Sequence, residues 1–272
     1  MTKDSTKEII EKEKIPKTKD KITRPILILN EDWTPRTELG RDVFNKNIKD
    51  ISEILDSGRK ILEPQIIDSL LELESELLLI GQAKGKFGGG QRRVFRQTQK
   101  KTREGNKPKF STVAVVGNKN GFVGIGYGKS KETVPAREKA LRNAKLNIFK
   151  ISRGSGSWES TSRDPHSIPF KVEGKQGSVK VILMPAPKGT GLCAEREIAK
   201  IVSLSGIKDI WSKTHGQTKN KINLIKATEK ALKKLSSTKV IPYFGEKVAI
   251  KEGPTWNLLL FKLGGQLMQR KK

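Results

Sequence analysis

The spacing of apolar positions changes along the chain, and each change predicts a different element of structure. Apolar residues recur three and four positions apart over residues 43–55, which is typical of an amphipathic helix that Gly58 would end. Residues 64–77 keep this helical spacing, and Pro64 suits the first turn of a helix. We therefore expect two helices before the first strand.

Strand and turn signals come next. Residues 111–116 are rich in β-branched side chains, an Asn-Gly pair at 120–121 is a hairpin signal, and residues 122–128 interleave large side chains with glycine. With the helix expected over 64–77, the predicted order is helix, strand, strand, strand, helix, with the basic loop in the first connection. The two runs above are two of these three strands. The last helix should start at Ser130 or Thr133 and turn inward Val134, Leu141, Ala144 and Ile148.

A second unit follows a stretch that has neither helical nor strand period and is rich in glycine, serine and proline. Its pattern predicts two strands, a helix, a strand and a final helix, which is an α+β layer. The corresponding residues are 170–174, 178–184, 192–204, 207–212 and 222–235.

These patterns divide the chain into six sections. The first section is charged and poor in apolar residues, so it should stay a flexible tail. The first α+β domain should contain a long basic connection rich in glycine, whose length asks for a functional reason. The sections are a tail over 1–24, an N-terminal extension over 25–61, the first domain over 62–151 with its basic loop at 84–109, a linker over 152–169, the second domain over 170–238 and a C-terminal extension over 239–272.

Charge changes this picture because it is concentrated in one part of the chain. The 272 residues carry 55 Lys plus Arg against 29 Asp plus Glu, a formal charge of +26. Residues 1–80 hold 14 of these cations and 17 of these acids, so they contribute −3 and residues 81–272 contribute +29. Such a local excess indicates a contact surface for a polyanion, and nucleic acid is the first candidate.

The sequence lacks the residues that several classes of function require. The chain begins with a polar segment of mixed charge, and stretches free of charge such as 110–118 are too short to cross a membrane. A single cysteine, Cys193, indicates a reducing, cytoplasmic compartment, and its place in an apolar helix predicts a small buried side chain. His166 and His215 stand too far from it in sequence to form an evident metal or nucleophile site. We expect no membrane contact, no cofactor and no catalysis.

The glycines at 121, 124, 126 and 128 do not have the spacing of a P-loop or a dinucleotide fold. Two readings stay open for them: a flat polyanion approaches the strand, or another backbone does.

Candidate RNA-binding residues are cations on the basic loop and in the linker. Loop cations could neutralise phosphates, although the loop could also be merely solvated. Trp158 could stack on a base, or it could fill a core. The candidates are Lys84, Lys86, Arg92, Arg93, Arg96, Lys100, Lys101, Arg103, Lys107 and Lys109 on the loop, then Lys129, Arg153, Trp158, Arg163 and Lys188.

Three motifs resemble a known family. Residues 117–129 with 136–144, then 182–192, then 204–211 are similar, in this order, to the small-subunit ribosomal protein S-five family. Residues 33–41, 153–159 and 165–172 resemble its archaeal and eukaryotic branch. Ser155, Ser160 and Ser162 stand where some relatives have linker cysteines, which removes any case for a metal there.

The resemblance implies a fold, a location and partners. It implies a first domain like the double-stranded-RNA-binding fold, with order α-β-β-β-α, and a second domain β-β-α-β-α with a left-handed crossover. It further implies a structural role in the small ribosomal subunit, near the channel through which mRNA enters, in support of subunit assembly and translational accuracy. The implied partners are small-subunit rRNA, ribosomal proteins such as those of the S-four and S-eight families, and mRNA. The alternative is a free regulator that binds double-stranded RNA.

Overall fold

The computed structural model describes residues 33–83, 85, 90–156, 164–240 and 249–253. The tail predicted over 1–24, most of the C-terminal extension, and the candidates Lys84, Lys86, Trp158 and Arg163 lie outside these ranges.

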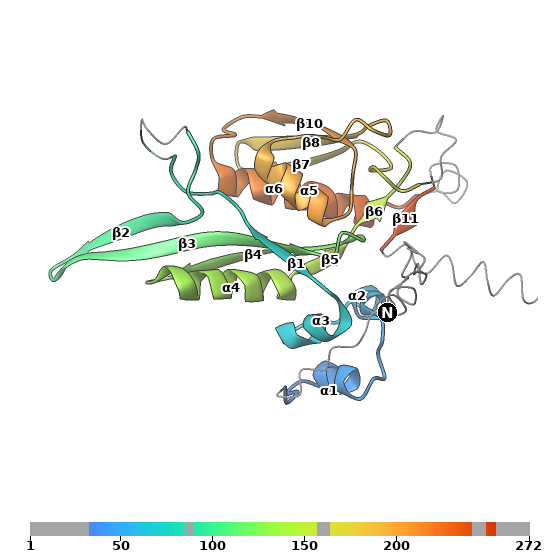
Figure 1. Cartoon of the computed structure of the whole chain (residues 1–272), viewed down its shortest axis with the longest axis horizontal. Coiled ribbons are helices and arrows are strands. Elements are labelled where there is room, and N and C mark those ends of the chain that lie inside the picture. The colour runs from blue at the N-terminus through green and yellow to red at the C-terminus, as the bar shows by residue number, and fades with distance from the viewer. Residues whose placement is uncertain (1–32, 84, 86–89, 157–163, 241–248, 254–272) are drawn as a thin grey trace, which may run out of the picture.

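The chain forms four layers in the order helix, sheet, helix, sheet (Figure 1). The first sheet has the order β1-β3-β4-β5, with β2 paired to β3, and the second has the order β7-β8-β10-β9. Helix α4 covers one face of the first sheet, while α5 and α6 lie between the two sheets (Figure 1). This arrangement confirms the α+β class with two domains, although the predicted domain boundaries stay predictions.

The first domain contains α3 (Pro64–Leu70), β1 (Glu74–Leu77), β2 (Arg96–Thr102), β3 (Gly105–Gly117), β4 (Phe122–Ser130), α4 (Thr133–Leu146) and β5 (Ile148–Lys150). The second contains β7 (Val172–Gln176), β8 (Val179–Pro185), β9 (Leu192–Cys193), α5 (Arg196–Leu204), β10 (Ile210–His215) and α6 (Lys221–Ser237). Outside both are α1 (Glu38–Phe44), α2 (Ile51–Asp56), β6 (Ser152–Arg153) and β11 (Lys251–Glu252).

The two domains share one hydrophobic core. Side chains alternate between the two faces of a strand, so neighbouring residues of β3 belong to different cores. Val113 and Val115 are fully buried in a cluster that includes the apolar sides of α5 and α6. Ala114 and Val116 are buried in a second cluster with α4 and the N-terminal helices. The second domain therefore covers one face of the first sheet instead of standing apart from it.

Backbone contacts join the same two domains. The buried carboxylate of Glu197, in α5, accepts a hydrogen bond from the backbone N–H of Leu79 at 2.9 Å. The N–H groups of Lys119 and Gly121 donate to the carbonyls of Leu204 and Ser205 at 2.9 and 3.0 Å. These bonds fix the β3–β4 turn against the end of α5.

The glycines of β4 allow the backbone of α4 to pack directly against the strand. Ideal Cβ atoms at Gly124, Gly126 and Gly128 would lie 2.2, 2.1 and 1.9 Å from backbone atoms of α4. The contacts on the helix come from Ala136, Ala140 and Ala144, which recur every four residues and so share one face. Of the two readings left open by the sequence, the approaching group is a backbone, not a polyanion. The expectation that Val134 points inward is wrong, because it is 64% exposed.

A side chain at the middle glycine should separate β4 from α4. We expect Gly126→Val to lower the free energy of unfolding by about 3 kcal/mol or more, because the helix backbone cannot move without opening the core. Chemical denaturation measures this loss. Gly85→Ala is the matched control, since its Cβ would meet nothing within 4 Å. Equal stability of the two variants would contradict the packing described for α4.

Two expectations for the N-terminal section are wrong. The helix expected over 43–55 is split into α1 and α2, and Lys46 between them adopts a left-handed conformation with φ 60°. Residues 74–77 form β1, which pairs antiparallel with β3, instead of continuing the helix from Pro64. Alternating leucine and glutamate over 71–77 is a strand signal that outweighs the helical spacing there.

Glu63 ties the start of the described chain to the helix α3. Its Oε1 accepts hydrogen bonds from the backbone N–H groups of Arg36 at 3.0 Å and Thr37 at 2.7 Å, and its Oε2 accepts one from Trp33 Nε1 at 2.9 Å. Desolvation alone would raise the pKa of Glu63, but the hydrogen bonds from Thr37, Arg36 and Trp33 together outweigh it, so the pKa is lowered.

A lowered pKa makes this anchor sensitive to acid. The stabilisation is present above the ordinary pKa of 4.5 and is lost as pH falls through the folded-state value. We expect Glu63→Gln to cost about 1 kcal/mol of unfolding free energy at pH 7, because one N–H group loses its acceptor. The difference from the wild type should shrink below pH 4.5 in thermal unfolding. A difference that is independent of pH would contradict the role of the carboxylate.

The linker expected over 152–169 is packed where the structure describes it. Strand β6 pairs with β11, and Gly154 forms an antiparallel bridge with Ser167. His166 is buried, and its Nδ1 lies 2.8 Å from Asp209 Oδ2. This segment is therefore part of the junction between the domains.

The second domain follows the expected order, with one strand added. Strands β7 and β8 form a hairpin, and β10 pairs antiparallel with β8 and parallel with β9. The helix expected to begin near residue 192 begins at Arg196, and Leu192 and Cys193 form β9 instead. Cys193 is exposed, so the prediction that it is buried within a helix is wrong. The hand of the crossover from β9 to β10 stays a prediction.

Candidate nucleic-acid interface

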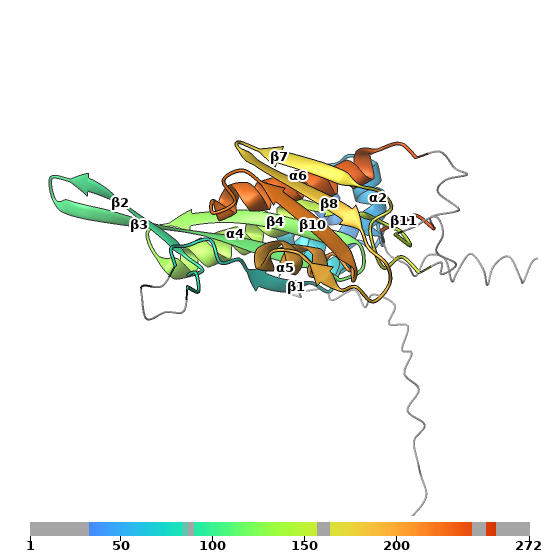
Figure 2. The same ribbon diagram turned by 90° about the horizontal axis from the view of Figure 1, so that it is seen from above.

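The basic segment predicted as a loop over 84–109 is largely a β-hairpin. Strand β2 pairs with the first half of β3 over seven residue pairs, from Arg96 opposite Ser111 to Thr102 opposite Gly105. Arg103 and Glu104 form the turn, and the hairpin projects from the body of the protein (Figure 2). The expectation of an irregular loop is therefore wrong for residues 96–109. Pairing with β3 satisfies the backbone groups of β2 that face β3, although β2 itself contains no apolar side chain.

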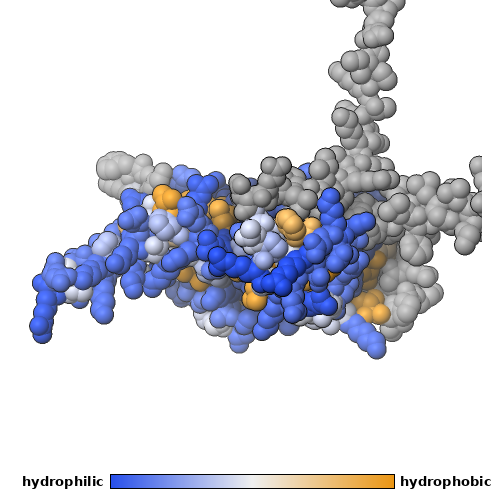
Figure 3. Space-filling view, turned by 90° about the horizontal axis from the view of Figure 1, so that it is seen from below, coloured by the Kyte–Doolittle hydropathy of each residue, from blue (hydrophilic) through white to orange (hydrophobic). Residues whose placement is uncertain are grey.

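Seen from the side of α4, this arm is hydrophilic over most of its length (Figure 3). Its exposed outer half has no core to join, so its side chains are available to a partner.

The cations of the hairpin lie mainly on one face. Residues directly opposite each other in an antiparallel pair share a face, so the pairing register sorts the side chains. Lys129 of β4 joins this face through its partner Ser111. The opposite face of the paired arm carries one cation, Lys101. We call the first set the basic face: Arg96, Lys100, Lys107, Lys109 and Lys129.

The basic face is the same sheet face that the second domain covers. The odd-numbered residues of β3 share one face. On the arm they are Lys107 and Lys109, and under α5 and α6 they are Val113 and Val115. Within the described chain, Lys107 has one ion pair, with the exposed Glu104 of the turn at 2.6 Å. Exposed ion pairs contribute little, so the positive charge of this face is left largely uncompensated.

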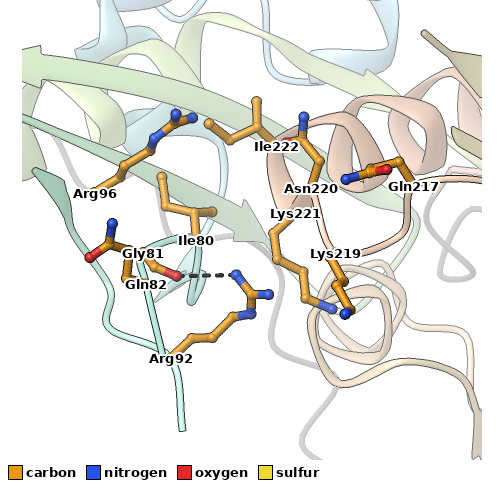
Figure 4. Close-up of a pocket in the computed structure, with 10 residues that line it drawn as sticks. All are labelled: Ile80, Gly81, Gln82, Arg92, Arg96, Gln217, Lys219, Asn220, Lys221 and Ile222. Carbon is orange, nitrogen blue, oxygen red and sulfur yellow. Dashed lines mark hydrogen bonds between the residues drawn. The ribbon is translucent and has the colours of Figure 1, made fainter. Parts of the chain in front are cut away.

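A cavity of about 310 Å³ lies where the basic face meets the second domain (Figure 4). The first domain contributes Arg92 and Arg96, and the second contributes Lys219 and Lys221, at the start of α6. A guanidinium nitrogen of Arg92 donates to the carbonyl of Gly81 at 3.2 Å (Figure 4). We call this cavity the interdomain notch; its lining is Ile80, Gly81, Gln82, Arg92, Arg96, Gln217, Lys219, Asn220, Lys221 and Ile222.

The structure separates the other predicted residues. Arg93 is exposed next to the notch, and Arg103 lies in the hairpin turn. Lys188 is exposed on the second domain, where it pairs with the exposed Asp164 at 2.9 Å, and this hydrogen bond raises the pKa of Lys188. Lys188 does not line the notch and is not on the basic face.

Arg153 is not a surface residue. It is 4% exposed, and its guanidinium donates to Asn120 Oδ1 at 2.9 Å and to the carbonyls of Gly253 and Gly206 at 3.0 and 3.5 Å. Burial lowers its pKa to about 10, so it stays protonated at neutral pH. The expectation that Arg153 meets a phosphate does not fit this burial, because its donors serve the junction between the domains.

Loss of this buried cation should affect folding more than RNA binding. We expect Arg153→Gln to lower the free energy of unfolding by about 2–4 kcal/mol, since three acceptors lose a shared donor. The RNA affinity of the folded variant should stay within about twofold of the wild type. Denaturation and an RNA titration below the unfolding transition measure the two effects. Normal stability with strongly reduced RNA affinity would instead indicate that Arg153 contacts RNA.

The sequence prediction missed Lys219 and Lys221. They precede or begin α6, far in sequence from the hairpin, and only the shared core brings them near Arg92. Among the residues described, no cluster of three or more His, Cys, Asp or Glu could hold a metal ion. None of the helices within the described ranges has the length and apolar character that a membrane span needs.

The fold is that of a two-domain α+β protein, and its basic face has the charge that matches a polyanionic partner. Residues 94–152 match the N-terminal domain of ribosomal protein S5, and residues 174–242 match its C-terminal domain. The chain is also similar over most of its length to archaeal proteins named small ribosomal subunit protein uS5.

The relative from Nanoarchaeum equitans is 49% identical over 228 residues, which cover 84% of this chain and 98% of the relative. Those from Hyperthermus butylicus and Methanococcus maripaludis are 47% and 42% identical, over 75% and 82% of this chain and 90% and 93% of the relatives. The chain belongs to the ribosomal protein S5 family. It is a structural constituent of the small ribosomal subunit and not an enzyme, and a free RNA-binding regulator finds no support.

Proposed function

We propose that the chain binds small-subunit rRNA through the basic face of the β2–β3 hairpin and its continuation at Lys129. The observation that carries this proposal is the sorting of charge: five cations lie on one face, and Lys101 alone lies on the other face of the arm. Cations aligned along one face can each neutralise a phosphate of a single backbone. A generally solvated hairpin would gain nothing from such sorting.

Repulsion within the free hairpin supports a polyanionic partner. Lys100 and Lys107 lie directly opposite each other on the basic face. Like charges in this position destabilise a sheet, and a two-stranded hairpin beyond the core has little stability to spare. A phosphate backbone along this face would offset the repulsion between the two lysines, because each would be attracted to a phosphate.

The section of the chain that carries no charge excess fits protein neighbours. Residues 1–80 contribute a net charge of −3, so an RNA surface gains little from them. Within them, Leu62 and Phe44 are exposed apolar side chains of the kind that protein contacts cover. Neighbours from the S-four and S-eight families, a position near the channel through which mRNA enters, contact with mRNA, and roles in assembly and translational accuracy belong to this proposal. They rest on the family resemblance.

Neutralising the basic face should weaken rRNA binding and reduce its salt dependence. The variant replaces Arg96, Lys100, Lys107, Lys109 and Lys129 by Gln. We expect the affinity for small-subunit rRNA to fall by about 30-fold or more at moderate salt, and the slope of log K against log salt to decrease by about 3–5. Filter binding across a salt series measures both quantities.

The control removes charge from the section assigned to protein neighbours. Lys46, Lys49 and Lys60 are exposed there, and their replacement by Gln should leave the salt slope unchanged. Thermal unfolding verifies that both variants are folded. The control removes three charges and the basic-face variant removes five, so the loss of affinity is compared per charge removed. If each charge removed from the control weakened rRNA binding as much as each charge removed from the basic face, binding would reflect total charge, and the assignment to the hairpin would be wrong.

A further inference from the structure

The interdomain notch has an origin different from that of the basic face, because both domains build it. One wall comes from residues 80–82 and Arg92, which lie between β1 and β2, and the other wall is the start of α6, with Lys219 (Figure 4). Arg96 lines the notch and also begins the basic face. An rRNA backbone that follows the basic face toward the body of the protein would therefore reach the notch.

Cations predominate among the polar side chains of the lining, beside the amides of Gln82, Gln217 and Asn220. Four lining residues are cations, and no Asp, Glu or aromatic residue from the described part of the chain lines the notch. One guanidinium bond of Arg92 goes to the carbonyl of Gly81, which leaves four N–H groups of its five. Lys221 has a carboxylate partner, Glu195, at 2.6 Å, but among the described ion pairs none involves Arg92, Arg96 or Lys219.

The walls are held in place before any ligand binds. Gly81 donates to the carbonyl of Arg93 at 2.8 Å, and Arg93 donates to the carbonyl of Gln82 at 3.1 Å. A Cβ at Gly81 would lie 2.3 Å from the carbonyl oxygen of Phe95, so the backbone is closely packed there. On the other wall, Ile222 packs against the core that both domains share. The fold fixes the backbone of both walls, and this lowers the cost of ordering their cations around a ligand.

We propose that the interdomain notch binds a single phosphate group of the rRNA backbone and thereby ties the root of the hairpin to α6. The inference rests on the proposed function for the source of the phosphate. A cavity of about 310 Å³ admits a phosphodiester group with part of its sugar. Guanidinium and ammonium donors match phosphate oxygens, and among the described residues no aromatic ring lines the notch for a base to stack on. A carboxylate of a neighbouring protein is the competing occupant.

The first experiment uses inorganic phosphate as the probe on the full chain. Phosphate also stabilises proteins without binding, so the test is the difference between two variants at equal ionic strength. Arg92→Gln with Lys219→Gln removes one cation from each wall and leaves the Lys221 pair and the basic face intact. Arg196→Gln with Lys230→Gln is the matched control, because both residues are exposed and neither lines the notch.

We expect phosphate, compared with chloride, to raise the unfolding midpoint of the wild type and the control by at least about 2 °C more than that of the notch variant. In the second experiment, the affinity for small-subunit rRNA should fall about tenfold in the notch variant, and the salt slope should decrease by about 2. The control should keep the wild-type values in both assays.

Each other outcome overturns the inference at a defined point. Equal phosphate stabilisation of all proteins would show that the notch holds no phosphate. Selective stabilisation with unchanged rRNA affinity would show a site for free phosphate or for the carboxylate of a protein, not for RNA. A basic-face variant that keeps Arg96 and replaces Lys100, Lys107, Lys109 and Lys129 by Gln separates this inference from the proposed function. If rRNA binding survives in this variant but not in the notch variant, the notch stands and the assignment to the hairpin fails.

Discussion

The alternation of side chains along β3 is the constraint on which the rest of the structure depends. This one strand of 13 residues runs from the hairpin turn into the centre of the molecule without a break in its pairing. Its odd positions bury Val113 and Val115 under the helices of the second domain. The same phase places Lys107 and Lys109 on the same face farther out. The core and the basic face are therefore two halves of one strand face.

This coupling explains why the domains act as one body. If the second domain were only tethered, cations on α6 could not hold a fixed position relative to Arg92. Burial of the sheet face between β3 and α5, reinforced by the buried Glu197 and by Arg153 at the junction, fixes that position. Burial of apolar surface is the dominant stabilising contribution, and here it also aligns the charges. Cations from both domains therefore line one cavity.

Much of the centre could be predicted from the sequence because its local and tertiary signals agree. The Asn-Gly turn, the β-branched run of β3 and the apolar stripes of α5 and α6 each indicate the element that forms. The helical spacing around Leu73 was misleading, because pairing with β3 decides the state of a short segment. The strand β2 has no apolar alternation, and it forms because β3 extends past the core and offers a partner. Cys193 lies in a short edge strand that no local signal marks.

The candidate site shows the same division. The cations of the hairpin were predictable from composition, but their sorting onto one face requires the register of β2 against β3. In the sequence Arg153 is a cation of the predicted linker, and only the packing of residues 206 and 253 around it reveals its burial. Lys219 gave no signal at all, because it joins the site through a contact between domains.

Cross-linking of the reconstituted small subunit, followed by mass spectrometry of the peptides bound to rRNA, tests the central claim most directly. A single surface built from both domains predicts that peptides of the hairpin over 96–111 and peptides containing residues 217–222 cross-link to the same rRNA segment. Peptides from the described N-terminal helices over 38–70 should be absent from that set. Cross-links that join the hairpin and residues 217–222 to separate, distant rRNA segments, or that come mainly from residues 38–70, would contradict the account.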